Sequence, residues 1–371
     1  MLASFFLSQE ASQVQEFWNL KRDRIIEFFG FGPWREMQPE LIGDRVRLDL
    51  MSWNGRLGLK SQGPLDFEVM NHQKAFIEIR NPDSVSPGIR SMMQILENDP
   101  IPLATAQLRF RSSPDGPLGL WIDAANVALK ELLEEKNWLR RTLDRGWRIE
   151  MGQKLKSPEW SESEQRFRLV ASVAQNWLHS FGDQGEVFPV LSLIGLFSQP
   201  GPEANRAMIA AGIDLLDSVS IPHQLKWMEW GAGCGNLSLA FCSRLGAQGI
   251  STELEGPAAH LLETNLKAFF PDRLALKKGA LSRLERDWKS DLWLLDPPRS
   301  GFHQLVRQLH TVWGAPKPQW ILLYSCHDKG LHADSGELRL AGFEVERYSL
   351  VDSFPGTPYV ETISLWKRKT R

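Results

Sequence analysis

The sequence is poor in cysteine and has no long apolar run. Its 371 residues include three cysteines, Cys234, Cys242 and Cys326, and no CxxC pair. A disulfide framework and a structural zinc site are therefore not expected. No stretch of 18 or more apolar residues occurs, so no membrane span is expected. The apolar start, Met1 to Leu7, lacks the basic region and cleavage site of a secretory signal, and we expect a cytoplasmic protein.

An excess of charge is also absent. The formal net charge of −2 argues against a surface coated with basic patches, although a local nucleic-acid footprint is compatible with it. Hydrophobic residues make up 42% and charged residues 24% of the chain, which is typical of a soluble globular protein. The length predicts two domains.

The first half of the chain has the pattern of an antiparallel α+β domain. Apolar spacing predicts an amphipathic helix over residues 8–29, ended by Gly30. Asp123 is predicted to cap a helix that runs to about Arg145 and covers the sheet. Short alternating runs predict strands at 45–50, 75–79, 104–111, 118–122, 147–151 and 166–170.

Two groups of basic side chains lie in this half. On the first helix, Lys21, Arg22 and Arg24 share the face opposite the apolar stripe; they form either a solvated face or a phosphate contact. A larger group on the predicted sheet and its helix could dock an RNA backbone. It could equally pair with neighbouring carboxylates. Its members are Arg109, Arg111, Arg140, Arg141, Arg145 and Arg148.

The pattern changes near residue 190. A helix is expected over 203–216, and strands and helices alternate after Pro222. Such alternation predicts a doubly wound, mostly parallel sheet of the Rossmann-like α/β class. We therefore expect an N-terminal α+β domain at residues 1–190 and a second domain at 191–371.

A glycine-rich turn follows the apolar strand at 225–230. It contains Gly231 and Gly233, which let a ligand approach the backbone closely at the start of a helix. Asn236 stands where the dinucleotide-binding fingerprint has its third glycine, so that class is disfavoured.

An acid ends the next strand. Glu253 follows the run at 247–252 and suits the hydroxyls of an adenosine-type ribose. Glu255 is the rival, but residues 254–256 look like the start of a helix. A glycine loop after one strand and an acid after the next together predict an S-adenosylmethionine site.

Three further polar groups mark strand ends. Asp296 follows the apolar run at 292–295 and precedes Arg299, Cys326 ends the next strand, and Glu361 begins the last one. A thiol, a carboxylate and a guanidinium on neighbouring strand ends could add to an electron-poor ring and remove a proton from it. A free cysteine is more often a buried structural residue, but polar residues follow Cys326, and they favour a reactive thiol.

From Phe197 onward the chain resembles the RNA (uracil-5-)-methyltransferase family, whose members form 5-methyluridine in tRNA or ribosomal RNA. The resemblance implies a class I methyltransferase domain behind a small RNA-binding domain. Five ordered motifs carry it: Phe197-x-Gln199-Pro…Asn205, Gly233-x-Gly-Asn236-x-Ser-Leu-Ala240, Asp296-Pro-Pro-Arg-Ser-Gly301, Ser325-Cys326 and Asp352-x-Phe-Pro355…Glu361.

The resemblance also implies roles for these residues. Cys326 falls on the nucleophile that adds to uracil C6, and Glu361 on the base that removes the C5 proton. Arg299 is the nearest cationic group that could favour the thiolate. By the resemblance, Gln199, Asn236, Glu253 and Asp296 fall where the family contacts S-adenosylmethionine, and the glycine-rich turn adds Gly231 and Gly233 to the expected cofactor residues.

The chain departs from the family's pattern around the cysteine. The family's tyrosine three residues before the cysteine is Leu323, and a tyrosine stands one residue closer. Neither the thiol, the carboxylate nor the cofactor acid is removed, so the departures concern the substrate base or its RNA context. The other replaced positions are Gly231, His327, Asp328, Gly330, Gly356 and Tyr359.

Two features found in some members of this family are absent from the sequence. No cysteine precedes residue 234, so the iron–sulfur cluster of some relatives is not expected, and there is no additional N-terminal β-barrel. Both absences favour the tRNA-directed members. We expect a monomer that binds RNA and S-adenosylmethionine, and no metal. Methylation of an exocyclic amine is disfavoured by Arg299, and an RNA-binding protein without turnover is the non-enzymatic alternative.

Overall fold

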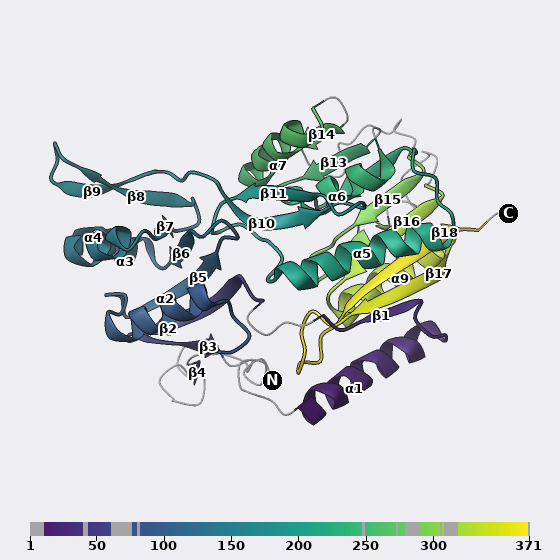
Figure 1. Cartoon of the computed structure of the whole chain (residues 1–371), viewed down its shortest axis with the longest axis horizontal. Coiled ribbons are helices and arrows are strands. Elements are labelled where there is room, and N and C mark those ends of the chain that lie inside the picture. The colour runs from purple at the N-terminus through teal and green to yellow at the C-terminus, as the bar shows by residue number, and fades with distance from the viewer. Residues whose placement is uncertain are drawn as a thin grey trace. The chain divides into compact units, whose positions relative to one another are not determined.

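The structure is a computed structural model that describes residues 11–39, 44–60, 76–79, 82–246, 249–271, 274–278, 290–304, 306–307 and 318–369. These residues form two compact units (Figure 1). Residues 44–178 and 192–202 belong to the first unit. Residues 11–39, 179–191 and 203–369 belong to the second. Compactness does not establish which segment folds on its own, and the domain boundary near residue 190 stays a prediction.

The first unit is built on an eight-stranded, mostly antiparallel sheet. The alternating runs predicted six of its strands but not those at 56–60 and 156–161. Its order is β4-β3-β2-β5-β6-β7-β8-β9, and all neighbours are antiparallel except β6 and β7. The strands are β2 (Arg47–Trp53), β3 (Arg56–Lys60), β4 (Phe76–Glu78), β5 (Thr105–Ser112), β6 (Leu118–Asp123), β7 (Arg148–Met151), β8 (Lys156–Ser161) and β9 (Arg166–Ala171). Outside it, β10 (Gln175–Phe181) pairs with β11 (Val187–Ser192).

Helices cover one face of this sheet. Strand alternation puts Leu48 and Leu50 of β2 into the core, where they join Leu108 and Phe110 of β5. Buried side chains of three helices complete this core. The helices are α2 (Pro87–Asn98), α3 (Asn126–Glu134) and α4 (Lys136–Asp144).

The predicted single helix from Asp123 to Arg145 is wrong in two respects. Asp123 is the last residue of β6, where its carboxylate accepts a hydrogen bond from the amide of Gln153. The N-cap position of α3 is Ala125, which makes no side-chain cap. The helical run is also divided at Glu135, whose backbone leaves the helical conformation.

The second unit contains a mixed sheet that is mostly parallel, in agreement with the predicted class. Its order is β1-β17-β18-β16-β15-β12-β13-β14, and only β18 runs antiparallel to its neighbours. The strands are β1 (Arg35–Met37), β12 (Trp227–Trp230), β13 (Gly249–Glu253), β14 (Leu274–Lys278), β15 (Leu292–Leu295), β16 (Trp320–Ser325), β17 (Phe343–Val351) and β18 (Glu361–Arg368).

Helices pack on both faces of this sheet. Those of one face share a core with Leu294, Leu322 and Ile363, and those of the other share one with Leu295 and Leu323. The first face is covered by α5 (Pro202–Ser218) and α6 (Asn236–Leu245), and the second by α1 (Ala11–Phe29) and α9 (Asp328–Leu340). A further helix of the described residues, α7 (Gly256–Phe269), contacts β13 and β14.

The N-terminal helix packs within the second unit. Trp18, Ile25 and Phe29 of α1 are buried in the same core as β17 and β18. The helix ends at Gly30 with a positive φ, as predicted, and residues 8–10 of the predicted helix lie outside the described residues. β1 follows and extends the sheet beside β17. In the described part of the chain, no helix is long and apolar enough to cross a membrane.

Candidate active site

Strand register brings the predicted cofactor residues to one edge of the second sheet. β12, β13 and β15 run parallel and in register, so they end at the same edge. Gly231 follows β12, Glu253 ends β13 and Asp296 follows β15. Ligands of open α/β sheets bind outside the carboxyl ends of the strands. This edge is therefore the candidate site.

The thiol and the carboxylate meet at the same edge. β16 ends with Ser325, which pairs with Thr362 of the antiparallel strand β18. The next position along this pair brings Cys326 opposite Glu361, the first residue of β18. Sequence separation hides this neighbourhood, but the antiparallel direction of the last strand produces it.

Four ionisable groups influence one another at this edge. Burial is the largest cause that raises the pKa of the Cys326 thiol to about 12; the charges of Glu361 and Asp296 contribute to this rise, and Arg299 opposes it. Burial likewise raises the pKa of Glu361 to about 8, with Asp296 adding to the rise and Arg299 opposing it. The sequence led us to expect a site that favours the thiolate. In the structure, the charges of Glu361 and Asp296 raise the pKa of the thiol by more than Arg299 lowers it.

A second buried acid lies beneath the glycine loop, and sequence reasoning missed it. Glu229 is 1% exposed, and burial raises its pKa to about 7. Its carboxylate accepts hydrogen bonds from the hydroxyls of Ser238 and Ser251, the latter at 2.9 Å. Glu229 thereby connects β12 to α6 and β13. The signal for it was a single acid within the apolar strand.

The glycine loop makes close contacts that need glycine. Gly231 has a φ of +75°, and a Cβ there would lie 3.0 Å from Cζ of Phe302 and 3.2 Å from the carbonyl oxygen of Asp296. The family's pattern has an apolar or aromatic residue at this position. Here the ring of Phe302, from the loop after β15, supplies apolar surface beside the glycine.

Glu253 is held at the mouth of the loop. Its Oε2 accepts a hydrogen bond from the backbone N–H of Gly233 at 2.8 Å. Its Oε1 accepts from the N–H groups of Leu254 and Glu255, at 2.6 and 2.8 Å. Of the two rival acids, Glu253 is therefore the one that contacts the glycine loop.

Asn236 and Asn205 form a reciprocal amide pair. The Nδ2 of Asn236 donates to Oδ1 of Asn205 at 2.7 Å, and the return bond measures 2.8 Å. Asn205, fully buried, also donates to the carbonyl of His179 at 2.9 Å. The pair ties α6 to α5 and orients the start of α6. Gln199 lies in the first unit, with 8% of its surface exposed, whereas the other predicted cofactor residues lie in the second.

The residues at this edge fit an adenosine-containing ligand. A Cβ on Gly233 would meet no atom within 4 Å, so the loop backbone stays accessible at that point. Glu253 is fixed in place by three backbone N–H groups. The loop leads directly into the N-terminus of α6, where the helix dipole favours negative charge.

Most of the arginines of the first unit have internal partners. Arg109 forms an ion pair with Asp49 at 2.6 Å and donates to the carbonyl of Leu196 at 3.2 Å. Arg111 is fully buried and donates to the same carbonyl at 2.6 Å. Both arginines thus hold the segment at 192–202 rather than presenting a phosphate-binding surface.

The arginines of α4 and its C-cap also have partners within the first unit. Arg141 and Arg145 form ion pairs with Asp99, at 2.8 and 3.1 Å. Arg140 lies with its guanidinium carbon 4.0 Å from the ring centre of Trp160. Of the two interpretations left open by the sequence, internal pairing describes these residues.

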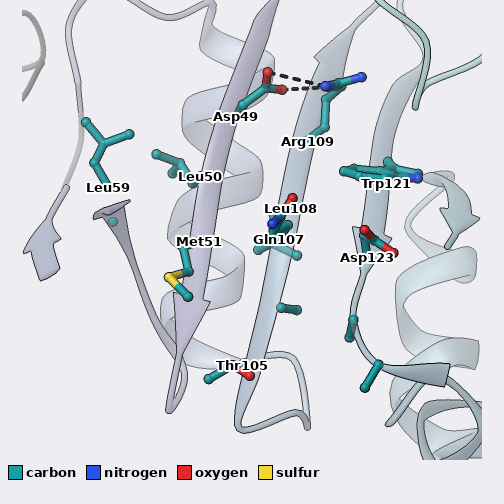
Figure 2. A pocket seen from close by; sticks show the side chains of 14 residues that line it. Asp49, Leu50, Met51, Leu59, Thr105, Gln107, Leu108, Arg109, Trp121 and Asp123 are labelled. Carbon is teal, nitrogen blue, oxygen red and sulfur yellow. Dashed lines mark hydrogen bonds and ion pairs between the residues drawn. The ribbon is translucent and has the colours of Figure 1, made fainter. Parts of the chain in front are cut away.

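A groove of about 650 Å³ lies on the sheet of the first unit (Figure 2). β2, β5 and β6 line it, with the Asp49–Arg109 ion pair on two neighbouring strands and Trp121 and Asp123 on the third (Figure 2). Because Arg109 is neutralised and two carboxylates are present, the groove is unsuited to binding an anion.

Comparisons with known proteins show which proteins the chain resembles. No family model matches the chain. An uncharacterized RNA methyltransferase of Bdellovibrio bacteriovorus is 28% identical over 335 residues, which cover 88% of this chain and 81% of that protein. The 23S rRNA (uracil(1939)-C(5))-methyltransferase RlmD of Shewanella sp. is 32% identical over 178 residues. That match spans 47% of this chain but only 38% of RlmD.

The fold has a solved counterpart. The tRNA (uracil-54, C5)-methyltransferase of Pyrococcus abyssi, solved in complex with S-adenosyl-L-homocysteine, aligns with a TM-score of 0.65 and 15% identity. The alignment covers 95% of this chain and 83% of that one. The fold of this chain is therefore that of the class I methyltransferases. By its sequence, it is a distant relative of the RNA methyltransferases that act on uracil C5.

Proposed function

We propose that this chain uses S-adenosylmethionine to form 5-methyluridine in a structured tRNA or ribosomal RNA. The observation that carries the proposal is the neighbourhood of Cys326 and Glu361 at the ends of β16 and β18. It lies beside the glycine loop of a class I methyltransferase fold. The uracil C5 enzymes among the relatives give it further support.

The cofactor set is proposed from the same sheet edge. When bound, S-adenosylmethionine supplies an electrophilic methyl group on a positively charged sulfonium. Glu253 is positioned by the glycine loop to accept hydrogen bonds from ribose hydroxyls. The proposed residues at this edge are Gly231, Gly233, Asn236, Glu253 and Asp296, and Gln199 is proposed from its sequence motif alone.

Cys326 and Glu361 divide the remaining chemistry between them. The Sγ of Cys326 loses its proton to solvent water and forms a bond to uracil C6, and the electron pair of the C5–C6 double bond moves toward C5 and the adjacent carbonyl. After C5 is methylated, ionised Glu361 accepts the C5 proton. The double bond then re-forms, the bond from Sγ to C6 breaks, and the thiolate leaves.

A row of one exposed cationic side chain and two half-buried aromatic rings suits an extruded base. The guanidinium carbon of Arg299 lies 5.5 Å from the ring centre of Tyr359, and the ring of His327 lies 5.7 Å from that of Tyr359. Single-stranded bases bind by stacking on such groups. Taking a base out of its stack costs a few kcal/mol of free energy, and stacking on this row can help to offset that cost.

The proposal is tested by nucleoside analysis. The protein is incubated with tritiated-methyl S-adenosylmethionine and RNA from cells that lack its gene, and the RNA is digested to nucleosides. We expect label in 5-methyluridine. Label in a methylated adenine would contradict the uracil assignment, and the absence of label would contradict methyltransferase activity.

Two variants test the assigned roles. Cys326→Ala should abolish label in 5-methyluridine and leave cofactor affinity nearly unchanged, because the thiol acts on the RNA. Glu361→Gln should accumulate a covalent RNA adduct that is visible on a denaturing gel, because the C5 proton is not removed. Turnover by Cys326→Ala would contradict the mechanism.

A further inference from the structure

Lys21 of α1 is buried among backbone carbonyls of the segment that leads to Glu361. Its side chain is 1% exposed, and Nζ lies 2.5 Å from Oδ1 of Asp352. The same ammonium donates hydrogen bonds to the carbonyls of Phe354 and Tyr359, each at 3.1 Å, and approaches that of Thr357 at 3.5 Å. One side chain therefore gathers the segment at 352–359 around itself.

This arrangement differs from both interpretations of the basic face of α1. An ammonium has three protons, and Asp352, Phe354 and Tyr359 account for them. Burying a charge costs several kcal/mol unless it is paired and hydrogen-bonded. Lys21 is thus neither a solvated charge nor a group available to a phosphate. The buried ammonium of Lys21 instead stabilises the segment at 352–359.

Arg24 repeats the contact one helical turn further along. Its Nε forms an ion pair with Oδ2 of Asp328 at 2.6 Å, and its guanidinium donates to the carbonyl of Pro358 at 2.8 Å. Asp328 lies two residues after Cys326, and Pro358 lies three residues before Glu361. Arg24 therefore joins the two segments that carry the thiol and the carboxylate.

We propose that Lys21 and Arg24 are positioning residues that hold the Cys326 and Glu361 segments in the reactive arrangement, so that α1 belongs to the catalytic centre. The inference rests on the proposed function for its catalytic meaning. Residues three apart share one helix face, which lets both side chains reach the same two segments. Tyr359, whose carbonyl binds Lys21, also lies in the aromatic row beside Arg299.

The test combines kinetics with hydrogen exchange in Lys21→Met and Arg24→Gln. We expect each to lower kcat for RNA methylation roughly 10- to 100-fold, the usual effect of losing a supporting contact. The KM for RNA should change less than about threefold, since neither residue contacts RNA. Backbone amides at 353–360 should exchange roughly tenfold faster or more, because they lose the groups that anchor them.

Arg22→Gln is the matched control. Arg22 lies on the same helix, and its ion pair is with the adjacent exposed residue Asp23. This variant removes the same charge and should leave both kcat and exchange at 353–360 unchanged. The double variant Lys21→Met with Asp352→Asn removes the charge left behind by the single change. It should fold and show the same rapid exchange, which keeps the test valid should Lys21→Met fail to fold.

The outcomes separate this proposal from the proposed function. Unchanged exchange in folded Lys21 and Arg24 variants would overturn the positioning role. A raised KM and a smaller salt dependence at constant kcat would also overturn it, because they indicate phosphate contacts. If the wild-type protein forms no 5-methyluridine, the proposed function fails. Faster exchange in the two variants would still support the positioning role.

Discussion

The Oδ2 atom of Asp334 accepts a hydrogen bond from the backbone N–H of Phe302 at 3.0 Å. Asp334 is fully buried on α9, and Phe302 ends the loop that begins at Asp296 and carries Arg299. A Cβ on Gly301 would lie 2.8 Å from the other oxygen of Asp334, so the carboxyl group packs directly under this loop. Asp334 of α9 therefore holds this loop in place.

This contact predicts different effects for two changes at Asp334. Asp334→Asn keeps an oxygen that accepts from Phe302, and we expect nearly normal stability and activity. Asp334→Ala leaves the buried N–H of Phe302 without an acceptor, which costs about 1–3 kcal/mol of stability. It should also lower kcat by displacing Arg299. Urea unfolding and the methylation assay measure the two effects, and equal behaviour of both variants would contradict the assigned role of the hydrogen bond.

Gly330 gives a second prediction about the same loop. A Cβ there would lie 3.0 Å from the carbonyl oxygen of Arg299 and 3.2 Å from the backbone nitrogen of Gly301. Gly330→Ala should therefore push the loop away, lowering activity and destabilising the protein by about 1–3 kcal/mol.

Gly336 supplies the control for that change. It lies in the same helix, and a Cβ added to it meets no atom within 4 Å. Gly336→Ala should raise stability by about 0.5–1 kcal/mol, because alanine restricts the unfolded chain and favours the helix. Thermal unfolding of both variants measures the contrast. A stabilised Gly330→Ala would show that the loop is not in contact at this point.

Stability should depend on pH through Glu361. Its pKa is raised from the ordinary value of 4.5 to about 8 by burial, so the native state binds this proton more tightly than the unfolded chain does. The free energy of unfolding is therefore expected to fall as the pH rises from about 4.5 to about 8.

Glu361→Gln should remove this part of the pH dependence and stabilise the protein by about 2–4 kcal/mol at pH 8.5, an order-of-magnitude figure. Glu344→Gln changes the net charge equally at an exposed position of β17 and serves as the control. Urea unfolding across this pH range measures the difference. If the free energy of unfolding varied with pH in the same way in wild type and in Glu361→Gln, Glu361 would not be a buried, uncompensated charge.

The Cys326 thiol should become more acidic when nearby negative charge is removed. Glu361 raises the pKa of this thiol, so Glu361→Gln should shift the pH midpoint of its alkylation by iodoacetamide downward. Cys234 and Cys242 are buried, and a Cys326→Ala sample corrects for any reaction there. An unchanged midpoint would mean that Glu361 does not face the thiol.

A positively charged ligand at the cofactor site should also make the Cys326 thiol more acidic. Sinefungin carries an ammonium in place of the sulfonium, whereas S-adenosylhomocysteine is neutral at that point. We expect faster alkylation of Cys326 with sinefungin than with S-adenosylhomocysteine at equal saturation, because a cation opposes the carboxyl charges. Equal rates with both would place the thiol out of reach of the cofactor's charge.

Local patterns were sufficient to predict the polar strand ends. Asp296, Cys326 and Glu361 each stand where an apolar run begins or ends, and a mostly parallel sheet brings such ends to one edge. The glycine loop and Glu253 followed from the same logic. These features depend on residues that are close in sequence and on the regularity of the fold.

Long-range contacts were not accessible in this way. The sequence places Lys21 on the polar face of a helix, and nothing near it indicates a partner 331 residues away. Tyr324 shows the same limit, since its hydroxyl reaches α5 where a Cβ on Gly212 would lie 2.0 Å from it. The strand β8 contains proline and lacks a regular apolar alternation, so its pairing with β9 gave no local signal.

The packing of α1 against the last segments of the chain also has a consequence for biosynthesis. Translation releases α1 early, but the ligands of Lys21 are made 331 to 338 residues later. At ordinary elongation rates this interval is on the order of tens of seconds. A nascent chain that still lacks residues 352–359 therefore cannot form the contacts of Lys21, and the arrangement proposed for Cys326 and Glu361 is completed only after these residues have been made.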